Sequence, residues 1–114
     1  MKIKMLHFNK LYQSLKKVNG EWHAGHVEWY FTWHYLKFFE EGVVIQASFA
    51  GENPALINKF FTKENTHFNH GAFWMENKII TLNFNQIQVK GFMNNDFSII
   101  FDGARHWEIY YAIF

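Results

Sequence analysis

The sequence predicts a mainly β fold, an antiparallel meander of short strands that closes into a small barrel. In the stretch 28–49 most positions are aromatic or β-branched, apart from a break at Glu40-Glu41-Gly42, and such residues favour strands over a helix. From residue 66 onward, short alternating apolar segments are separated by Asn, Asp and Gly turn signals. The last segment, 107–114, is apolar, and an apolar strand at an open sheet edge would promote aggregation. Closure of the sheet into a barrel would remove that edge.

The stretch 28–49 is interpreted as a strand, a tight turn and a second strand. Glu40-Glu41-Gly42 suits a type I turn in which Gly42 has a positive φ, and this turn places Phe39 opposite Val43. Both faces of the first strand are apolar, so we expect both to be covered. We predict that the odd-numbered face is the principal core, because it is the more apolar. It carries Trp29, Phe31, Trp33, Tyr35, Lys37, Phe39, Val43, Ile45, Ala47 and Phe49.

Before this hairpin, the apolar residues of 5–18 recur at helical spacing, with polar residues between them. Asn19-Gly20 follows, and Gly20 suits the left-handed residue that ends many helices. The pattern predicts an amphipathic helix over 5–18. This helix would cover the second apolar face of the first strand or close one end of the barrel.

After the hairpin, Asn53 suits a helix cap and Pro54 the first helical position, so we predict a short helical insertion over 54–62. The strands that follow are predicted at 66–75, 78–84, 86–93, 97–101 and 107–114, with turns at Glu76-Asn77, Asn85, 94–96 and Asp102-Gly103. The chain would then be a single domain, 1–114, whose barrel of about seven strands occupies 20–114.

The composition limits the classes of function. Charged residues make up 18% of the 114 residues and the net charge is +1, so we expect neither a nucleic-acid partner nor an anionic membrane surface. There is no cysteine, which excludes a disulfide framework and a thiolate nucleophile. The first residues lack the apolar core of a secretory signal, and no apolar run approaches a membrane span of about 18 residues. We therefore expect a soluble cytoplasmic protein.

Three segments carry a resemblance to a known family. Gly20-Glu21-Trp22, the hairpin 36–44 and the hairpin 71–80 resemble the Gly-x-Trp opening and two hairpins of small bacterial lipocalin-like (calycin) β-barrel domains. The resemblance implies a ligand-binding barrel in which a late arginine packs across the opening tryptophan, here Arg105 across Trp22. The helical insertion, the short chain and the place of Arg105 before the last strand depart from the family pattern.

The seven histidines include two His-x-x-His pairs, His23 with His26 and His67 with His70. Residues three apart on a strand face opposite ways, so neither pair could chelate a metal unless the backbone turns between them. Gly25 makes a turn plausible for the first pair. Zinc also needs three or four ligands, and no acidic residue stands at a diagnostic spacing. We predict surface or rim histidines, with no metal and no cofactor.

The sequence favours a non-catalytic binding module for a small apolar ligand or a protein partner, since it has no nucleophile elbow, phosphate loop or paired-carboxylate motif. The residues expected to contact a ligand are Trp29, Phe31, Trp33, Tyr35, Ile45, Phe49 and Arg105. A small barrel holds either one ligand or packed side chains, and the many large rings favour packed side chains. One alternative is an enzyme of the same shape that acts on a small hydrophobic acid, with Arg105 as carboxylate anchor. Another is a homodimer through an aromatic sheet face.

Overall fold

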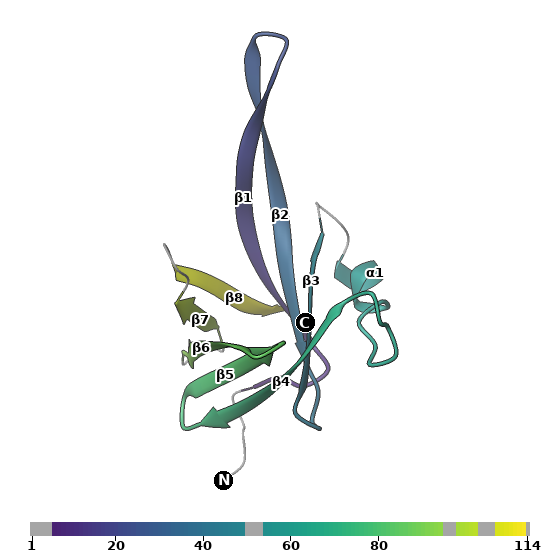
Figure 1. Cartoon of the computed structure of the whole chain (residues 1–114), viewed down its shortest axis with the longest axis vertical. Helices are drawn as coiled ribbons and strands as arrows, with labels where there is room; N and C mark the ends of the chain where they lie inside the picture. The colour runs from purple at the N-terminus through teal and green to yellow at the C-terminus, as the bar shows by residue number, and fades with distance from the viewer. Residues whose placement is uncertain (1–5, 50–53, 95–97, 103–106, 114) are drawn as a thin grey trace.

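A computed structural model describes residues 6–49, 54–94, 98–102 and 107–113, and for 15–23, 26–32, 54, 102 and 107–108 it describes the backbone (Figure 1). In this part of the chain the strands are β1 (Leu11–His23), β2 (His26–Phe38), β3 (Val43–Phe49), β4 (Asn69–Glu76), β5 (Ile79–Phe84), β6 (Ile87–Met93), β7 (Ile99–Asp102) and β8 (Trp107–Ile113). The helix is α1 (Pro54–Asn58).

The eight strands form a closed antiparallel barrel in sequence order, which confirms the predicted fold class. Each strand pairs with the next, and β8 pairs back onto β1 with Leu11 opposite Ile113 and Gln13 opposite Tyr111. Along this contact the backbone of the last strand is paired and does not form an open edge.

The predicted helix over 5–18 is wrong, because this region contains most of β1. Leu11 and Tyr12 are adjacent and both buried, but they belong to different apolar clusters on opposite faces of the sheet. A short amphipathic helix is marginal without a surface to lie on, whereas here the segment pairs with β2 and closes the barrel. The expected helix stop, Asn19-Gly20, lies at a shift of strand register between Val18 and Glu21, which is the mark of a β-bulge.

The turn between β2 and β3 has the predicted register. Gly42 has a φ of 84°, as the type I turn with a left-handed glycine requires. The amide of Phe39 donates to the Val43 carbonyl at 2.8 Å, and the amide of Gly42 donates to the Phe39 carbonyl at 3.0 Å. Phe39 therefore lies opposite Val43.

The barrel interior is built from the even-numbered face of this hairpin, so the prediction that the odd face forms the principal core is wrong. Leu36 and Phe38 of β2 and Val44 of β3 belong to the larger cluster, to which all eight strands contribute. Its buried members are Leu6, Tyr12, Leu36, Phe38, Val44, Phe73, Ile80, Leu82, Met93, Ile99, Phe101 and Tyr110. Both faces of the hairpin are apolar, and the direction in which the sheet curves decides which one is enclosed.

The odd face packs on the outside of the barrel against α1 and the segment that follows it. Its buried members are Leu11, Tyr35, Phe39, Ile45, Ile57 and Phe61, with Trp33, Val43, Ala47, Phe49, Phe68 and Ile113 packed around them. Over 33–39, where the side chains of this strand are described, the expectation that both faces are covered is thus confirmed. The cover comes from the helical insertion, whose α-helix ends at Asn58 instead of residue 62. Pro54 holds the predicted first helical position, and Asn53 lies outside the described residues.

The remaining hairpins agree with the predicted turns where the chain is described. Asn77 has a φ of 56° between β4 and β5, and Asn85 and Gln86 have φ values of 51° and 70° between β5 and β6. Positive φ at both central residues is the signature of a type I′ hairpin turn. Residues 95–97 and 103–106 are outside the described residues, so the turns predicted there stay predictions.

One close backbone approach inside the barrel depends on a glycine. A Cβ on Gly91 would lie 2.6 Å from Cε1 of Phe101, the cross-strand partner of Gly91. The Phe101 ring therefore lies over the β6 backbone and meets the Tyr110 ring edge to face at 5.5 Å. An aromatic residue that covers a glycine on the neighbouring strand is common in curved sheets.

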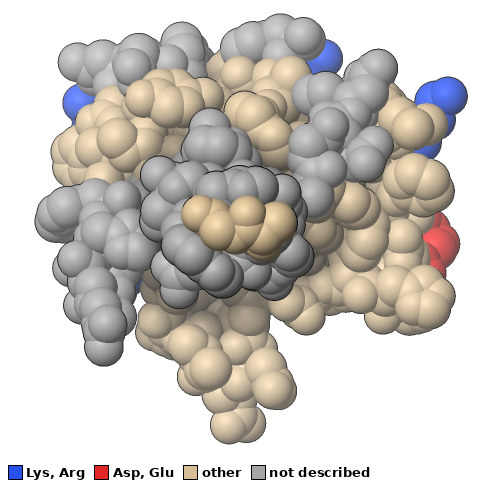
Figure 2. All heavy atoms as spheres, turned by 90° about the horizontal axis from the view of Figure 1, so that it is seen from above, with Lys and Arg blue, Asp and Glu red and all other residues tan. Residues whose placement is uncertain are grey.

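A long two-stranded ribbon extends from the barrel (Figure 1). β1 pairs with β8 over Leu11–Gln13 and β2 pairs with β3 over Trp33–Phe38, while the described pairings of 16–23 and 26–32 are with each other. We call residues 16–32 the arm. The molecule accordingly measures 57 Å along its longest axis and 30 and 29 Å across. In the view onto the tip of the arm, the described charged side chains lie at the periphery (Figure 2).

Candidate interaction surface

The structure brings four of the predicted ligand-contact residues together, outside the barrel. Trp33, Tyr35, Ile45 and Phe49 belong to the outer cluster, where the Tyr35 and Phe49 rings lie 6.0 Å apart. The rings of Phe61 and Phe68, from the segment after α1, pack against Phe49 at 6.4 and 5.6 Å. These side chains therefore contact another part of their own chain.

For the other three predicted ligand-contact residues, Trp29, Phe31 and Arg105, the structure does not describe the side chains, so their role stays a prediction. Trp29 and Phe31 lie in the arm, where the backbone of Phe31 is opposite Lys17. Arg105 lies outside the described residues, and with it the expected contact to Trp22. The Gly20–Trp22 segment does not open the first strand, because β1 begins at Leu11 and Trp22 is near its far end.

Aromatic rings pack against one another in the described interior of the barrel. Phe38 meets Tyr12 edge to face at 5.3 Å and Phe73 at 5.0 Å. The Tyr12 hydroxyl accepts a hydrogen bond from the His7 amide at 2.9 Å. Burial raises the pKa of Tyr12, although this hydrogen bond lowers it in part. These residues give the barrel a packed core at this position.

A continuous row of apolar side chains crosses the outer face of β5, β6, β7 and β8. Ile79 is opposite Phe92, Phe92 is opposite Ile100, and Ile100 is opposite Ile109. Directly opposite residues lie on one face with their Cβ atoms about 5 Å apart. Ile79, Phe92 and Ile109 are 47%, 49% and 37% exposed. We call Ile79, Phe92, Ile100 and Ile109 the apolar row.

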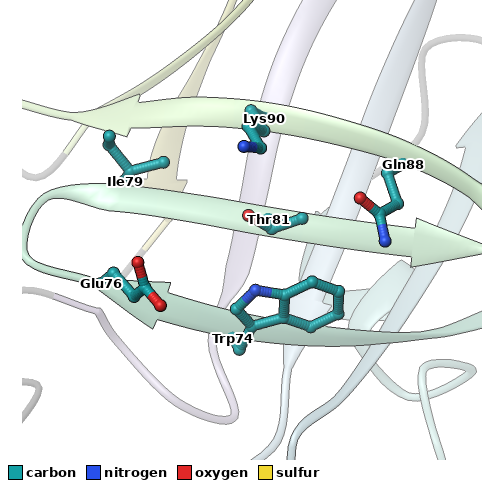
Figure 3. A pocket seen from close by; sticks show the side chains of 6 residues that line it. All are labelled: Trp74, Glu76, Ile79, Thr81, Gln88 and Lys90. Atoms are coloured by element: carbon teal, nitrogen blue, oxygen red, sulfur yellow. The ribbon is translucent and has the colours of Figure 1, made fainter.

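A groove of about 230 Å³ adjoins this row on the outer face of β4, β5 and β6 (Figure 3). It is lined by Trp74, Glu76, Ile79, Thr81, Gln88 and Lys90. Trp74 is opposite Thr81, and Thr81 is opposite Lys90. The exposed Trp74 indole forms one wall, and the Glu76 carboxylate and the Lys90 ammonium stand on the two outer strands of the groove. The groove thus combines an aromatic surface with one acid and one base.

Sequence reasoning missed this surface, although the sequence holds a signal for it. Phe73-Trp74 and Ile79-Ile80 are adjacent apolar pairs within strands. Phe73 and Ile80 are buried inside the barrel, and Trp74 and Ile79 are exposed outside it. An antiparallel strand with one solvated face should carry polar residues at the outer positions. Apolar residues there indicate a surface that is covered by something else.

A second polar feature lies beneath the end of α1. Lys37 is 9% exposed, donates from Nζ to Asn58 Oδ1 at 3.0 Å, and lies 5.5 Å from the centre of the Phe39 ring. Loss of hydration by burial lowers the pKa of Lys37. Lys63 lies 5.9 Å from the same ring and donates to Glu41 Oε1 at 2.9 Å. This hydrogen bond lowers the pKa of Glu41.

The two His-x-x-His pairs differ in geometry. In the second pair, both histidines contact Asn65. Its Oδ1 accepts a hydrogen bond from the His67 amide at 2.9 Å, and its backbone carbonyl oxygen lies 2.6 Å from His70 Nε2. His23 and His26 are cross-strand partners on either side of the β1–β2 turn. Among the side chains that the structure describes, no group of three or more His, Asp and Glu residues is placed to hold a metal ion.

Comparison of the chain with protein-family models, with curated proteins and with solved structures gives no match. In the described part of the chain, no helix has the length and the apolar character that crossing a membrane requires.

Proposed function

We propose that this chain is a non-catalytic binding module, and that it binds a second copy of itself through the apolar row and the adjoining groove. The observation that carries the proposal is the continuity of Ile79, Phe92, Ile100 and Ile109 across four neighbouring strands. Scattered exposed apolar side chains are normal, but a contiguous patch rimmed by polar residues marks an interaction site.

The shape and charge of the surface support a second copy as the partner. A two-fold interface uses the same patch on both chains, so the patch must complement itself. An apolar row on a sheet can pack face to face against its own copy, about 10 Å away. Glu76 and Lys90 line the same groove on different strands. A two-fold arrangement can therefore place the acid of one chain opposite the base of the other.

A small apolar ligand is less well supported. The described interior is occupied by packed rings such as Phe38 and Phe73. The outer groove of about 230 Å³ is smaller than the roughly 300–1,000 Å³ of most small-molecule pockets. It suits a single protein side chain. The enzyme alternative depends on Arg105 and stays a prediction, as does the cytoplasmic location.

We also infer a relationship to lipocalin-like barrels. The closed eight-stranded meander and the Gly42 hairpin support it. The Gly20–Trp22 segment gives no support, because it does not begin the first strand.

The test is the oligomeric state of the full chain, measured by analytical ultracentrifugation over a range of concentrations. We expect a dimer for the parent chain and a monomer for Phe92→Glu, since a charge in the centre of the row would have to be buried unpaired. Ile87→Glu is the matched control, because Ile87 is 68% exposed and lies at the other end of β6, outside the row. The control should remain a dimer.

A parent chain that stays monomeric at all concentrations contradicts the proposal. Equal loss of the dimer in Phe92→Glu and Ile87→Glu would also contradict it, because the interface would not be the apolar row. Saturable binding of an apolar dye by a monomeric parent chain would instead favour the ligand alternative.

A further inference from the structure

The tip of the arm brings together two histidines that a continuous strand would place on opposite faces. Ala24 and Gly25 form the turn between β1 and β2, with φ values of 45° and 89°. His23 and His26 flank this turn as direct cross-strand partners. Directly opposite residues share one face of an antiparallel ribbon. The His-x-x-His pair therefore meets the condition for chelation that an extended strand would not allow.

Two glutamates occupy the neighbouring position on the same face. Glu21 and Glu28 are also direct cross-strand partners, and each is two residues from a histidine along its own strand. Residues two apart on a strand face the same side, about 7 Å apart, and opposite residues are about 5 Å apart. Glu21, His23, His26 and Glu28 thus form a two-by-two arrangement, which we call the tip quartet. Trp22 and Val27 are the cross-strand pair between the two glutamates and the two histidines, and this pair lies on the other face of the ribbon.

We propose that the tip quartet binds a divalent transition metal ion of the Zn²⁺ class. Imidazole nitrogen and carboxylate oxygen are ligands that Zn²⁺ takes in four-coordinate sites. Ca²⁺ and Mg²⁺ prefer sets made of oxygen ligands, so the two histidines disfavour them.

The energetics of the arm support a bound cation. Two like charges directly opposite each other destabilise an antiparallel pair, and Glu21 and Glu28 are such a pair. An isolated two-stranded hairpin is marginally stable in water, and the described pairings of the arm beyond the barrel are between its own strands. A metal ion would neutralise the carboxylates and tie the strands together, since metal-binding free energy adds to folding free energy.

The test uses the full chain and Zn²⁺, titrated against a chromophoric chelator, with Co²⁺ as the spectroscopic probe. We expect one ion per chain and the visible absorption of four-coordinate Co²⁺. The double variant His23→Ala/His26→Ala should weaken binding by about 100-fold or more, since loss of a supporting partner alone weakens metal sites about 10–100-fold. The matched control is His67→Ala/His70→Ala, the other His-x-x-His pair, and it should bind as the parent chain does.

Two further measurements test the composition of the site. Affinity should fall as the pH drops from 7 to 5, because imidazoles must be neutral to bind the ion. Glu21→Gln/Glu28→Gln should weaken binding by about tenfold or more, and unchanged affinity in this variant would overturn the four-residue set. Circular dichroism of each variant checks that the barrel remains folded.

Three outcomes would overturn the proposal as a whole. The first is equal affinity in the parent chain and in His23→Ala/His26→Ala. The second is loss of binding in the His67→Ala/His70→Ala control. The third is a ratio of one ion to two chains, which would indicate an ion held between copies. None of these results bears on the dimer test at Phe92, so the two proposals can fail independently.

Discussion

The ammonium group of Lys37 donates a hydrogen bond to Asn58 Oδ1 at 3.0 Å, from a position where the lysine is 9% exposed. This contact joins β2 to the last residue of α1. It gives the buried cation a partner on the outer, otherwise apolar face of the sheet. The pair therefore helps to hold α1 on the barrel, together with the buried Ile57.

Removal of one partner should destabilise the fold, whereas removal of the charge should not. In Asn58→Ala the ammonium loses its acceptor, and we expect a loss of about 1–3 kcal/mol in the free energy of unfolding. In Lys37→Met the desolvated charge is replaced by a side chain of similar length, and stability should be unchanged or higher. Asn69→Ala, which removes an exposed bond to Gln46, is the control. Urea denaturation measures all three, and equal losses for Asn58→Ala and Asn69→Ala would contradict this account.

The lowered pKa of Lys37 predicts a pH dependence of stability. Between the folded pKa and the ordinary value of 10.5, the unfolded chain binds more protons than the folded chain. Stability attributable to Lys37 should therefore rise with pH through this window and level off above it. The measurement is the difference in unfolding free energy between the parent chain and Lys37→Met from pH 7 to 11. The parent chain should gain stability relative to Lys37→Met as the pH rises through this window, and a constant difference or a relative loss would contradict the prediction.

Gly42 should tolerate asparagine better than valine. Its φ of 84° is strained for a β-branched residue, while the space for a Cβ is adequate, with the Phe73 carbonyl at 3.6 Å. Gly42→Val should destabilise by more than about 1 kcal/mol, and Gly42→Asn by less, because asparagine adopts positive φ more readily. Thermal unfolding of both variants tests this, and equal losses would mean that backbone conformation is not the cause.

Gly91→Ala should be destabilising through Phe101. The new Cβ would lie 2.6 Å from the buried ring, and overpacking of this kind costs about 1–3 kcal/mol. Phe101→Leu relieves the overlap, so the double variant should lose less than the sum of the two single variants. Denaturant unfolding of the four chains gives this coupling, and additive losses would show that Phe101 is not what restricts residue 91.

The proposed dimer predicts a charge-reversal effect in the groove. Glu76→Lys and Lys90→Glu should each weaken dimerisation, because like charges would then meet across the two-fold axis. The double variant restores opposite charges and should recover affinity. Analytical ultracentrifugation at low and high salt measures this, and the single-variant effect should diminish as salt screens the charges. If the double variant is as weak as the single ones, Glu76 and Lys90 do not face each other between chains.

The strands and most of their turns could be predicted from the sequence because their causes are local. Alternation in 79–84 and the signals at Gly42, Asn77 and Asn85 depend on the conformational preferences of a few adjacent residues. The N-terminal segment is the exception. Leu11, Tyr12 and Leu15 fit a helical spacing, and the long-range pairing with β2 and β8 overrides that weak preference.

The candidate sites were less accessible to sequence reasoning. The apolar row exists because Ile79, Phe92, Ile100 and Ile109 come from four strands held in one register. The tip quartet exists because the Ala24-Gly25 turn folds His26 back beside His23. The apolar row has no fixed spacing in the chain, whereas the tip quartet lies within residues 21–28 and depends on the turn at Ala24-Gly25.

The sequence by itself determined that this chain forms a β-meander with two apolar faces on its central hairpin. Tertiary structure alone decided that Leu36 and Phe38 lie inside the barrel while Tyr35 lies outside beneath Phe61. Both faces carry large apolar side chains, so composition does not distinguish them. The closure of β8 onto β1 and the docking of α1 distinguish them, because these contacts join residues that are distant along the chain.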